Sequence, residues 1–229
     1  MKAVILAGGL GTRLKPFTEA IPKPLLPIGE KAVLEIQIEH LKKYGFDEIY
    51  LATNYKSDYI RNFFGDGSKY GVKLFISKEK TPLGTVGPLT LLQDKLNDPF
   101  LLMNGDIISN VNFKKLFDFA QKNQSALTIT IKKLITPFEF GNILFNGDFV
   151  TEIQEKPNLE HFILAGIYVM KPDIFKYIPQ NTYFGMDSLI DNFLCHNIKV
   201  AKYELTEYWL DIGRIGDYEK AQEEIKDKF

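Results

Sequence analysis

The chain has 229 residues, of which 45% are hydrophobic and 25% are charged, a composition typical of a globular protein and not of a disordered one. Lysine and arginine (28) almost balance aspartate and glutamate (29), for a net charge of -1. This balance argues against a nucleic acid as the main partner, because such binding depends on a broad basic surface. The charge balance does not exclude a small phosphate-bearing ligand, because such a ligand needs only a few cations.

Location is suggested by what the sequence lacks. No apolar run approaches the length needed to cross a bilayer, and the stretch after Met1 is too short for a secretory signal. A single cysteine, Cys195, cannot form an internal disulfide, which suits a reducing compartment. We therefore expect a cytoplasmic protein without membrane contact, and we expect Cys195, which follows an apolar run, to be buried and unreactive.

The first half alternates short apolar runs, which predict strands, with stretches of helical period. The expected strands span residues 3–7, 48–53, 72–77 and 100–103, and the expected helices span 32–41, 56–64, 88–96 and 113–121, the last with Asn112 as its N-cap. This alternation predicts an α/β fold with a Rossmann-like, mainly parallel sheet that helices flank on both faces.

The second half has a different pattern. Strands are expected at 126–131 and 164–170, and Asn146-Gly147 predicts a hairpin turn between two short strands within 141–150. A helix at 186–195 and a charged helix at 214–229 complete the chain. Since no linker or repeat interrupts it, we expect one domain over residues 1–229.

A glycine-rich loop follows the first expected strand. Gly8, Gly9 and Gly11 would let backbone N–H groups surround an anion. The loop does not match the dinucleotide fingerprint, which needs glycine where Leu14 stands, and the chain has no Gly-Lys pair for a P-loop. Arg13 and a proline-flanked Lys23 come next; they are either phosphate-binding cations or solvated surface residues.

Two aspartates follow expected strands. Asp106 comes after 100–103 and Asp211 after 208–210, and ligands gather at the carboxyl ends of strands in open parallel sheets. Two carboxylates suit a Mg²⁺ ion that also binds phosphates, although each aspartate could instead cap a helix or turn. No two aspartates stand two positions apart, which argues against a glycosyltransferase with an Asp-x-Asp metal motif.

Together these motifs resemble the sugar-phosphate nucleotidylyltransferase family, and most of all its mannose-1-phosphate guanylyltransferase-like members. The resemblance rests on residues 6–14, 23–29, 82–89, 104–106, 155–157, 165–168 and 209–213, in that order. It implies a GT-A-like nucleotidyltransferase fold and an enzyme that joins a nucleoside triphosphate to a sugar 1-phosphate with release of pyrophosphate. It also implies that residues 1–125 mainly bind the nucleotide and residues 126–229 mainly the sugar phosphate.

The resemblance also assigns residues to roles. It gives catalysis to Arg13, Lys23 and Asp106, and a Mg²⁺ cofactor to Asp106 and Asp211. It gives the nucleotide to Leu6, Ala7, Gly8, Gly9, Gly11, Thr12, Arg13, Lys23, Pro82, Gly84, Thr85, Asn104 and Gly105. It gives the sugar phosphate to Gly141, Glu155, Lys156, Gly166 and Trp209.

Several points stay open. Residues 82–89 favour GTP, but UTP, dTTP or CTP remain alternatives, as does a cytidylyltransferase acting on a non-sugar phosphate. Phe140 and Leu164 depart from the family pattern near the expected sugar contacts, so the sugar is not identified. A non-catalytic nucleotide sensor is a further alternative, which predicts the loss of Arg13, Lys23 or one aspartate. The oligomeric state is open, a homodimer included.

Overall fold

A seven-stranded mixed sheet forms the centre of the protein. The computed structural model describes residues 1–228, with residues 226–228 described by their backbone alone, so that Phe229 of the expected last helix lies outside it. The strand order is β12-β8-β11-β6-β1-β4-β5. These strands are β1 (Lys2–Leu6), β4 (Glu48–Thr53), β5 (Lys73–Lys78), β6 (Phe100–Asn104), β8 (Leu127–Pro137), β11 (Asn158–Met170) and β12 (Val200–Glu204).

Pairing within the sheet confirms the mainly parallel α/β fold. β6, β1, β4 and β5 run parallel, as do β12 and β8, whereas β11 is antiparallel to both of its neighbours. Three two-stranded ladders complete the set: β2 (Pro27–Ile28) with β3 (Lys31–Ala32), β7 (Ile107–Ser109) with β13 (Trp209–Asp211), and β9 (Asn142–Asn146) with β10 (Phe149–Gln154).

Helices cover both faces of the sheet because its residues alternate between two cores. In β1, Ala3 and Ile5 face one core and Val4 faces the other. The first core is closed by α2 (Val33–Lys43), α3 (Ser57–Phe64) and α4 (Phe113–Asn123), and the second by α5 (Met186–Cys195) with the 3₁₀ helices η4 (Gly87–Lys95) and η5 (Pro172–Tyr177).

A third, smaller core lies beneath the glycine-rich loop. It joins Leu14, Ile36, Ile108, Leu210 and Ile212, which come from segments far apart in the chain. Near this core lie η1 (Thr12–Leu14), α1 (Phe17–Ala20), η2 (Lys23–Leu25) and α6 (Ile215–Lys228), whereas η3 (Ser68–Tyr70) packs against the first core through Tyr70. This core fixes the first turn of the chain against β7 and β13.

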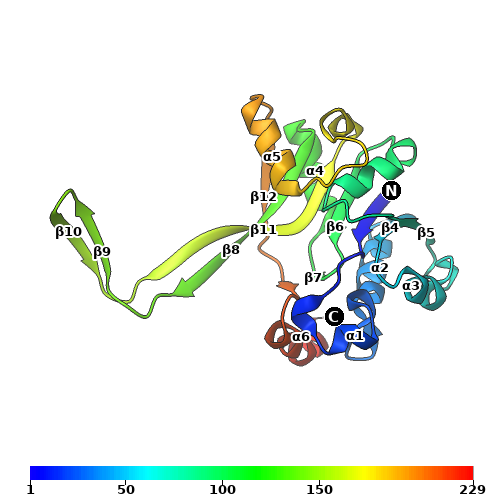
Figure 1. Cartoon of the computed structure of the whole chain (residues 1–229), viewed down its shortest axis with the longest axis horizontal. Coiled ribbons are helices and arrows are strands. Elements are labelled where there is room, and N and C mark those ends of the chain that lie inside the picture. Colours follow the sequence, from blue (N-terminus) through cyan, green and yellow to red (C-terminus); the bar gives the residue numbers. More distant parts are fainter. Residues whose placement is uncertain (229) are drawn as a thin grey trace.

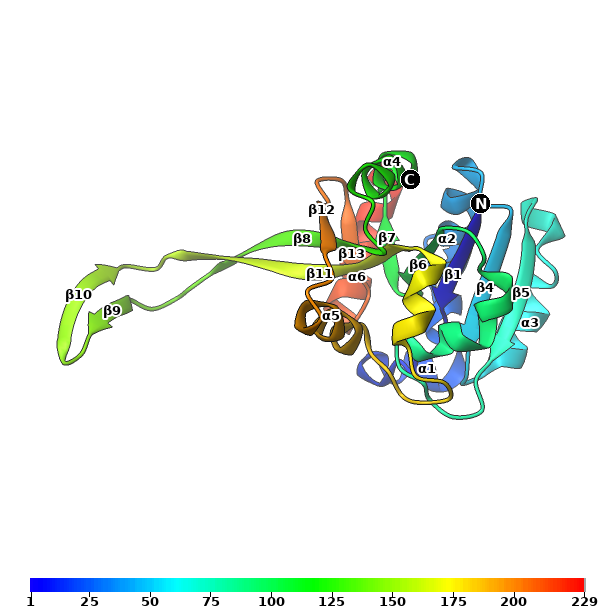
Figure 2. The same cartoon turned by 90° about the horizontal axis from the view of Figure 1, so that it is seen from above.

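Strands β8 and β11 leave the body as a long arm that ends in the β9–β10 hairpin (Figure 1), and the view from above shows the same projection (Figure 2). The arm begins at a register shift in β11 between Leu164 and Tyr168, where Gly166 has a φ of 72°. Such a bulge bends the strand that carries it. Beyond it, the pairing runs without a break to Asn158 opposite Pro137.

Several expectations need correction. The expected strands at 126–131 and 164–170 are the body ends of the much longer β8 and β11. The segment expected as a helix at 88–96 is the 3₁₀ helix η4, in which the Thr90 hydroxyl bonds to the Gly87 carbonyl. Cys195 is exposed, because α5 buries the opposite face through Leu189 and Phe193. The hairpin at 141–150 is confirmed, but its loop is Gly147-Asp148 rather than Asn146-Gly147, because Asn146 pairs with Phe149, and its second strand continues to Gln154.

The Asn112 cap is confirmed, because its side chain accepts a hydrogen bond from the Lys115 backbone at 3.0 Å. No helix within residues 1–228 combines the length and the apolar character that crossing a membrane requires.

The loop from Pro82 to Gly87 is held against the segment before α5. The backbone N–H groups of Val86 and Gly87 both donate to the Phe184 carbonyl, at 3.0 and 3.1 Å. Gly84 has a φ of 82°, and a Cβ there would come within 2.7 Å of the same carbonyl oxygen. Only glycine fits this approach without strain.

We expect Gly84→Ala to lower the free energy of unfolding by about 1–3 kcal/mol, because alanine disfavours this conformation and its methyl group meets backbone. Gly9→Ala is the matched control, since a Cβ on Gly9 would have nothing within 4 Å and its φ is not positive. Denaturant titration of both variants measures the difference. Equal stabilities would contradict the close approach.

Candidate active site

The glycine-rich loop links β1 to η1 and is tightly held at one point. Gly11 has a φ of 61°, and its carbonyl accepts hydrogen bonds from the Thr18 hydroxyl at 2.8 Å and the Leu14 N–H at 2.9 Å. A Cβ on Gly11 would lie 2.7 Å from a Thr18 methyl carbon and 3.4 Å from Lys23 Cβ. The loop therefore lies directly against Lys23, while Gly9 is exposed with open space beside it.

The two aspartates meet at the edge of the sheet. Asp106 lies in the turn between β6 and β7, and Asp211 ends β13. Because β7 and β13 pair with Ile107 opposite Asp211, and because the Ile212 N–H donates to the Asp106 carbonyl at 2.9 Å, the two residues are neighbours across this ladder.

Both expected cations reach the same place. Lys23 Nζ lies 2.5 Å from Asp106 Oδ2, and its side chain is only 10% exposed. A Cβ placed on Gly213 would lie 3.5 Å from Arg13 Nη2 and 3.4 Å from Asp211 Oδ1. The Arg13 guanidinium and the Asp211 carboxylate therefore lie close together beside Gly213. The structure thus gathers Arg13, Lys23, Asp106 and Asp211, which the sequence separates by up to 198 positions.

The balance of charge within this group is uneven. Burial raises the pKa of Asp211, and the charge of Asp106 raises it further, whereas Lys23 and Arg13 oppose both effects. Asp211 Oδ1 is buried and has no hydrogen-bond partner among the described residues. A buried carboxylate oxygen without a donor is a place where an additional cation would be stabilised.

The donor set fits magnesium better than a metal held by protein alone. Within residues 1–228 no cluster of three or more His, Cys, Asp or Glu could hold an ion. Mg²⁺ is commonly bound by one or two carboxylates together with substrate phosphates and water. Two neighbouring carboxylates, one with an unpartnered oxygen, match that pattern.

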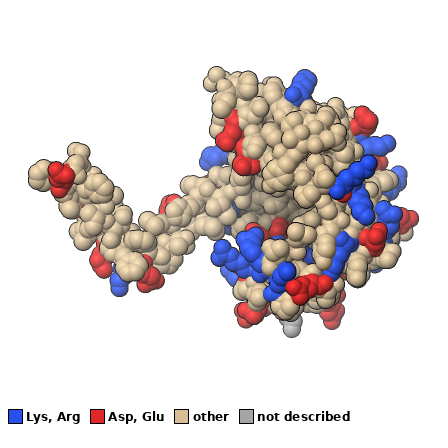
Figure 3. Space-filling model, viewed as in Figure 1, with Lys and Arg blue, Asp and Glu red and all other residues tan. Residues whose placement is uncertain are grey.

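A hollow of about 380 Å³ opens beside the aspartates, a size suited to a small ligand. It is lined by Leu6, Gly8, Gly9, Leu10, Ala52, Asn54, Glu79, Pro82, Gly84, Thr85, Asn104, Asp106 and Tyr183. Eight of these are residues that the sequence assigns to the nucleotide or the metal. In the space-filling view, the body is hollowed beside the base of the arm, and lysine and arginine lie along the lower rim of the hollow with some aspartate and glutamate among them (Figure 3).

The other residues expected to bind the nucleotide lie behind or beside the lining of this hollow. The Ala7 N–H donates to the Ala52 carbonyl at 2.8 Å, and the Gly105 N–H donates to the Leu6 carbonyl at 3.0 Å. A Cβ on Gly105 would lie 2.5 Å from that same oxygen, so the two backbones touch. Thr12 is exposed at the start of η1.

Sequence reasoning missed Glu79, which lines the hollow. Its carboxylate is largely buried and accepts a hydrogen bond from the Leu83 N–H at 2.8 Å, and burial raises its pKa. A Cβ on Gly8 would lie 3.3 Å from Glu79 Oε1, so the free side of the carboxylate faces the glycine-rich loop. Glu79 follows a parallel strand, the same signal that pointed to Asp106.

Gln37 was also missed. Its side-chain amide donates to the carbonyls of Asn104 at 2.9 Å and Ile107 at 2.8 Å, so α2 holds the turn that carries Asp106. A glutamine within the apolar face of the expected helix at 32–41 was the available signal. Its burial is explained by these two hydrogen bonds.

The residues expected to bind the sugar phosphate are divided between the body and the arm. Gly166 lies in the body, where a Cβ would come within 2.8 Å of the Asn104 side chain. Trp209 packs against the first core, and its indole N–H donates to the Ala165 carbonyl at 2.7 Å.

Gly141, Glu155 and Lys156 lie at the hairpin end of the arm instead. There, a Cβ on Gly141 would lie 3.4 Å from Glu155 Oε2, so these residues are neighbours of each other. Within one chain the structure does not bring them to the aspartates, because β8 and β11 stay paired to the far end of the arm.

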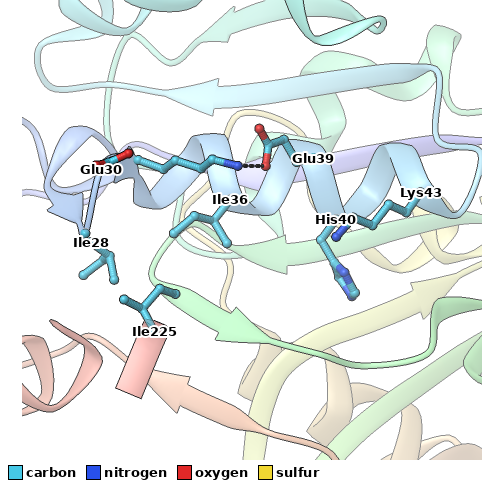
Figure 4. Close-up of a pocket in the computed structure, with 9 residues that line it drawn as sticks. Ile28, Glu30, Ile36, Glu39, His40, Lys43 and Ile225 are labelled. Atoms are coloured by element: carbon cyan, nitrogen blue, oxygen red, sulfur yellow. Dashed lines mark hydrogen bonds and ion pairs between the residues drawn. The ribbon is translucent and has the colours of Figure 1, made fainter. Parts of the chain in front are cut away.

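A second hollow, of about 330 Å³, lies between α2, β2 and α6 (Figure 4). Its rim carries the Lys31–Glu39 ion pair, with Nζ and Oε2 2.6 Å apart, and His40, whose pKa is lowered by burial. None of the residues that the sequence assigns to nucleotide, metal or sugar lines it. It is separate from the site described above.

Comparison with known proteins agrees with this geometry. A family model described as nucleotidyl transferase matches residues 2–228. "Probable mannose-1-phosphate guanylyltransferase 1" of Oryza sativa subsp. japonica is 38% identical over 95% of this chain, and the match spans 63% of the rice protein. The chain therefore covers less than two thirds of the length of this curated relative.

Solved structures resemble the chain over nearly its whole length. The putative glucose-1-phosphate thymidylyltransferase of Bacillus anthracis, solved in complex with a sucrose, has a TM-score of 0.80 and 24% identity, covering 99% of this chain and 96% of its own, which shows the shared fold. HddC from Yersinia pseudotuberculosis has a TM-score of 0.78 and 30% identity, covering 98% and 99%, and has also been solved with GMP-PN. With a family match across nearly every residue, the chain belongs to the nucleotidyl transferase family.

Proposed function

We propose that the protein transfers the nucleoside monophosphate group of a triphosphate, preferably GTP, to a sugar 1-phosphate. The observation that carries this proposal is the meeting of two cations and two carboxylates beside a hollow lined by the glycine-rich loop. Membership of the nucleotidyl transferase family supports the reaction class, and the guanylyltransferase names of relatives support the nucleotide. All four charged residues are present, unlike the expectation for a non-catalytic sensor.

In this reaction an oxygen of the sugar phosphate attacks the α-phosphorus of the triphosphate. The new P–O bond forms as the bond to the β-phosphate oxygen breaks, and pyrophosphate leaves. The attacking phosphate is already an anion, so no strong general base is required. The obstacle is repulsion between two anions, which positioned cations and N–H donors reduce.

The residues of the site suit this task. Backbone N–H groups of Gly9, Gly11 and Thr12 would hold the triphosphate, because the loop leaves open space on its exposed side. Arg13 would neutralise the leaving pyrophosphate with its planar fork of donors. Lys23, pinned against Asp106, would lie between the α-phosphate and the incoming phosphate.

Asp106 and Asp211 would hold a magnesium ion, which supplies neutralising charge to the phosphates when bound. The unpartnered Asp211 Oδ1 and its raised pKa support this assignment, since both indicate a carboxylate short of positive charge. Gln37 and the β7–β13 ladder fix the spacing of the two aspartates.

Glu79 would read the base. Guanine presents two neighbouring donors, its ring N–H and its amino group, and a carboxylate accepts hydrogen bonds from both. Uracil and thymine present one N–H between two carbonyl oxygens, which a carboxylate would repel. The burial of Glu79 strengthens such discrimination, because an unpaired buried polar group is costly.

The proposal is tested by measuring pyrophosphate release over a matrix of GTP, UTP, dTTP, CTP and ATP against a panel of sugar 1-phosphates. The highest kcat/KM is expected for GTP with one of the sugar phosphates. Release of no pyrophosphate from any pair would overturn the proposal, and a preference for another triphosphate would overturn its guanine part.

Arg13→Ala and Lys23→Ala should each lower kcat by roughly 10²-fold or more, the scale of losing one preorganised donor. Lys15→Ala is the matched control, because Lys15 is an exposed cation two residues from Arg13 whose ion pair, among the described side chains, is with Glu19 at 3.3 Å. Steady-state kinetics of the three variants measure the effect. Turnover close to that of the unmodified protein in both site variants would contradict their roles.

Glu79→Gln should reduce kcat/KM for GTP by about 10- to 100-fold, the loss of a charge-assisted hydrogen bond to the base, with a much smaller effect on UTP. Glutamine keeps an oxygen that can accept from the Leu83 N–H, so the loop is retained. Lys80→Gln, on an exposed neighbour, is the control. An unchanged ratio of kcat/KM between GTP and UTP would remove Glu79 from base recognition.

A further inference from the structure

The arm exposes apolar side chains that the body would normally cover. Eleven of the twenty-three large apolar residues classed as exposed lie between Leu134 and Leu164. Phe149 is 79% exposed, Phe145 74% and Phe140 72%, and all three lie at the hairpin end. A concentration of this kind on a soluble chain marks an interaction surface.

The hairpin lacks a third layer that could stabilise it. In the part of the chain that the structure describes, β9 pairs with β10 alone, and both faces of this two-stranded ladder carry exposed residues. An isolated two-stranded hairpin is marginal in water and normally gains stability by packing against another element. In both views the hairpin stands away from every helix of its own body (Figures 1 and 2).

Charge indicates the kind of surface that the arm would meet. Residues 132–163, beyond the Ile131–Leu164 pair, contain five carboxylates and three lysines, so the arm has a net charge of -2, against -1 for the whole chain. The hollowed face of the body has lysine and arginine along its rim (Figure 3), and Arg13 and Lys23 lie in its site. The rest of this same chain has a net charge of +1, and it places these cations beside the Asp106–Asp211 pair, where an acidic arm from a second copy would meet them.

We propose that two copies of this chain exchange arms, each arm delivering Glu155 and Lys156 to the active site of the other copy. This inference rests on the proposed function, which assigns those two residues to the sugar phosphate. Within one extended chain the body holds the nucleotide and metal residues but not these sugar contacts, so each site is incomplete without the second copy. The exchange completes both sites and covers both apolar arms.

A partner copy explains the extended arm better than closure over its own body. β8 and β11 pair continuously from Ile131 opposite Leu164 to Pro137 opposite Asn158. A ribbon held by this ladder cannot reverse its direction without breaking pairs. A copy related by a two-fold axis receives the arm in its extended form, and the symmetry makes each contact occur twice.

Crosslinking between different chains tests the exchange without relying on activity. In a Cys195→Ser background, one chain carries Lys156→Cys and the other carries Thr12→Cys, both at exposed positions. After mixing, a short bifunctional maleimide should join the two chains into a covalent pair. Lys73→Cys, an exposed position on the edge strand β5, replaces Thr12→Cys as the control and should give no such pair.

The outcome that overturns the exchange is defined by a single chain with both Thr12→Cys and Lys156→Cys. If the arm folds over its own body, this chain crosslinks internally, keeps the mass of one chain, and the mixed chains give no covalent pair. Light scattering gives a second readout: the unmodified protein should have twice the mass of 26.2 kDa. Phe145→Ser with Phe149→Ser should shift it to single chains, whereas Leu91→Ser on the body should not.

Activity then tests delivery of the arm. Arg13→Ala and the double variant Glu155→Gln, Lys156→Ala should each be inactive alone, and an equal mixture should recover about a quarter of the unmodified activity, because half of the dimers are mixed and each has one intact site. Trans crosslinking together with unmodified activity in the Glu155→Gln, Lys156→Ala variant would retain the exchange and remove the two residues from the reaction. If the mixed chains crosslink but the unmodified protein has no activity, the proposed function is rejected and the exchange is kept. If the unmodified protein has the mass of a single chain, the exchange is rejected.

Discussion

The site depends on one electrostatic constraint: two carboxylates, Asp106 and Asp211, are held side by side at the edge of the sheet. The negative charge of Asp106 makes it harder to ionise the neighbouring Asp211 carboxyl. Burial of Asp211 makes its ionisation harder still. The fold maintains the pair by the β7–β13 ladder and by the two hydrogen bonds from Gln37 to the intervening turn. Lys23 balances part of the charge, and the negative charge that remains favours a further cation at this point.

The fold separates a rigid body, which holds the cations and the aspartates, from an extended arm, which holds Glu155 and Lys156. Leu14 of η1, Leu26 next to η2, and residues of β7 and β13 share the third core, so the segments around the groups expected to meet phosphate are fixed by one set of packed side chains. The arm has no such support and carries the residues expected to meet the sugar. Under the proposed function, this division would let a small body hold the phosphates while the sugar contacts come from the arm.

Much of this could be predicted from local sequence, and the limits have physical causes. Short apolar runs predicted the strands of the parallel sheet, and stretches of helical period predicted α2 to α4. Both patterns arise because each element buries apolar side chains at a regular spacing. The rule that ligands gather at strand ends found Asp106, and would have found Glu79 had it been applied to β5. The length of β8 and β11 could not be predicted, since their outer halves lack a neighbouring layer and therefore lack the apolar alternation of a core strand. Cys195 was placed in the core because its run is apolar, but helix geometry turns it outward.

The most direct measurement of the central claim is the anomalous X-ray scattering of Mn²⁺, used in place of Mg²⁺, in crystals grown with a non-hydrolysable GTP analogue. The account predicts one peak in contact with both Asp106 and Asp211 and with a phosphate of the analogue, and with Arg13 also on the phosphates. A metal bound away from these carboxylates, or one that reaches only a single one of them, would contradict it.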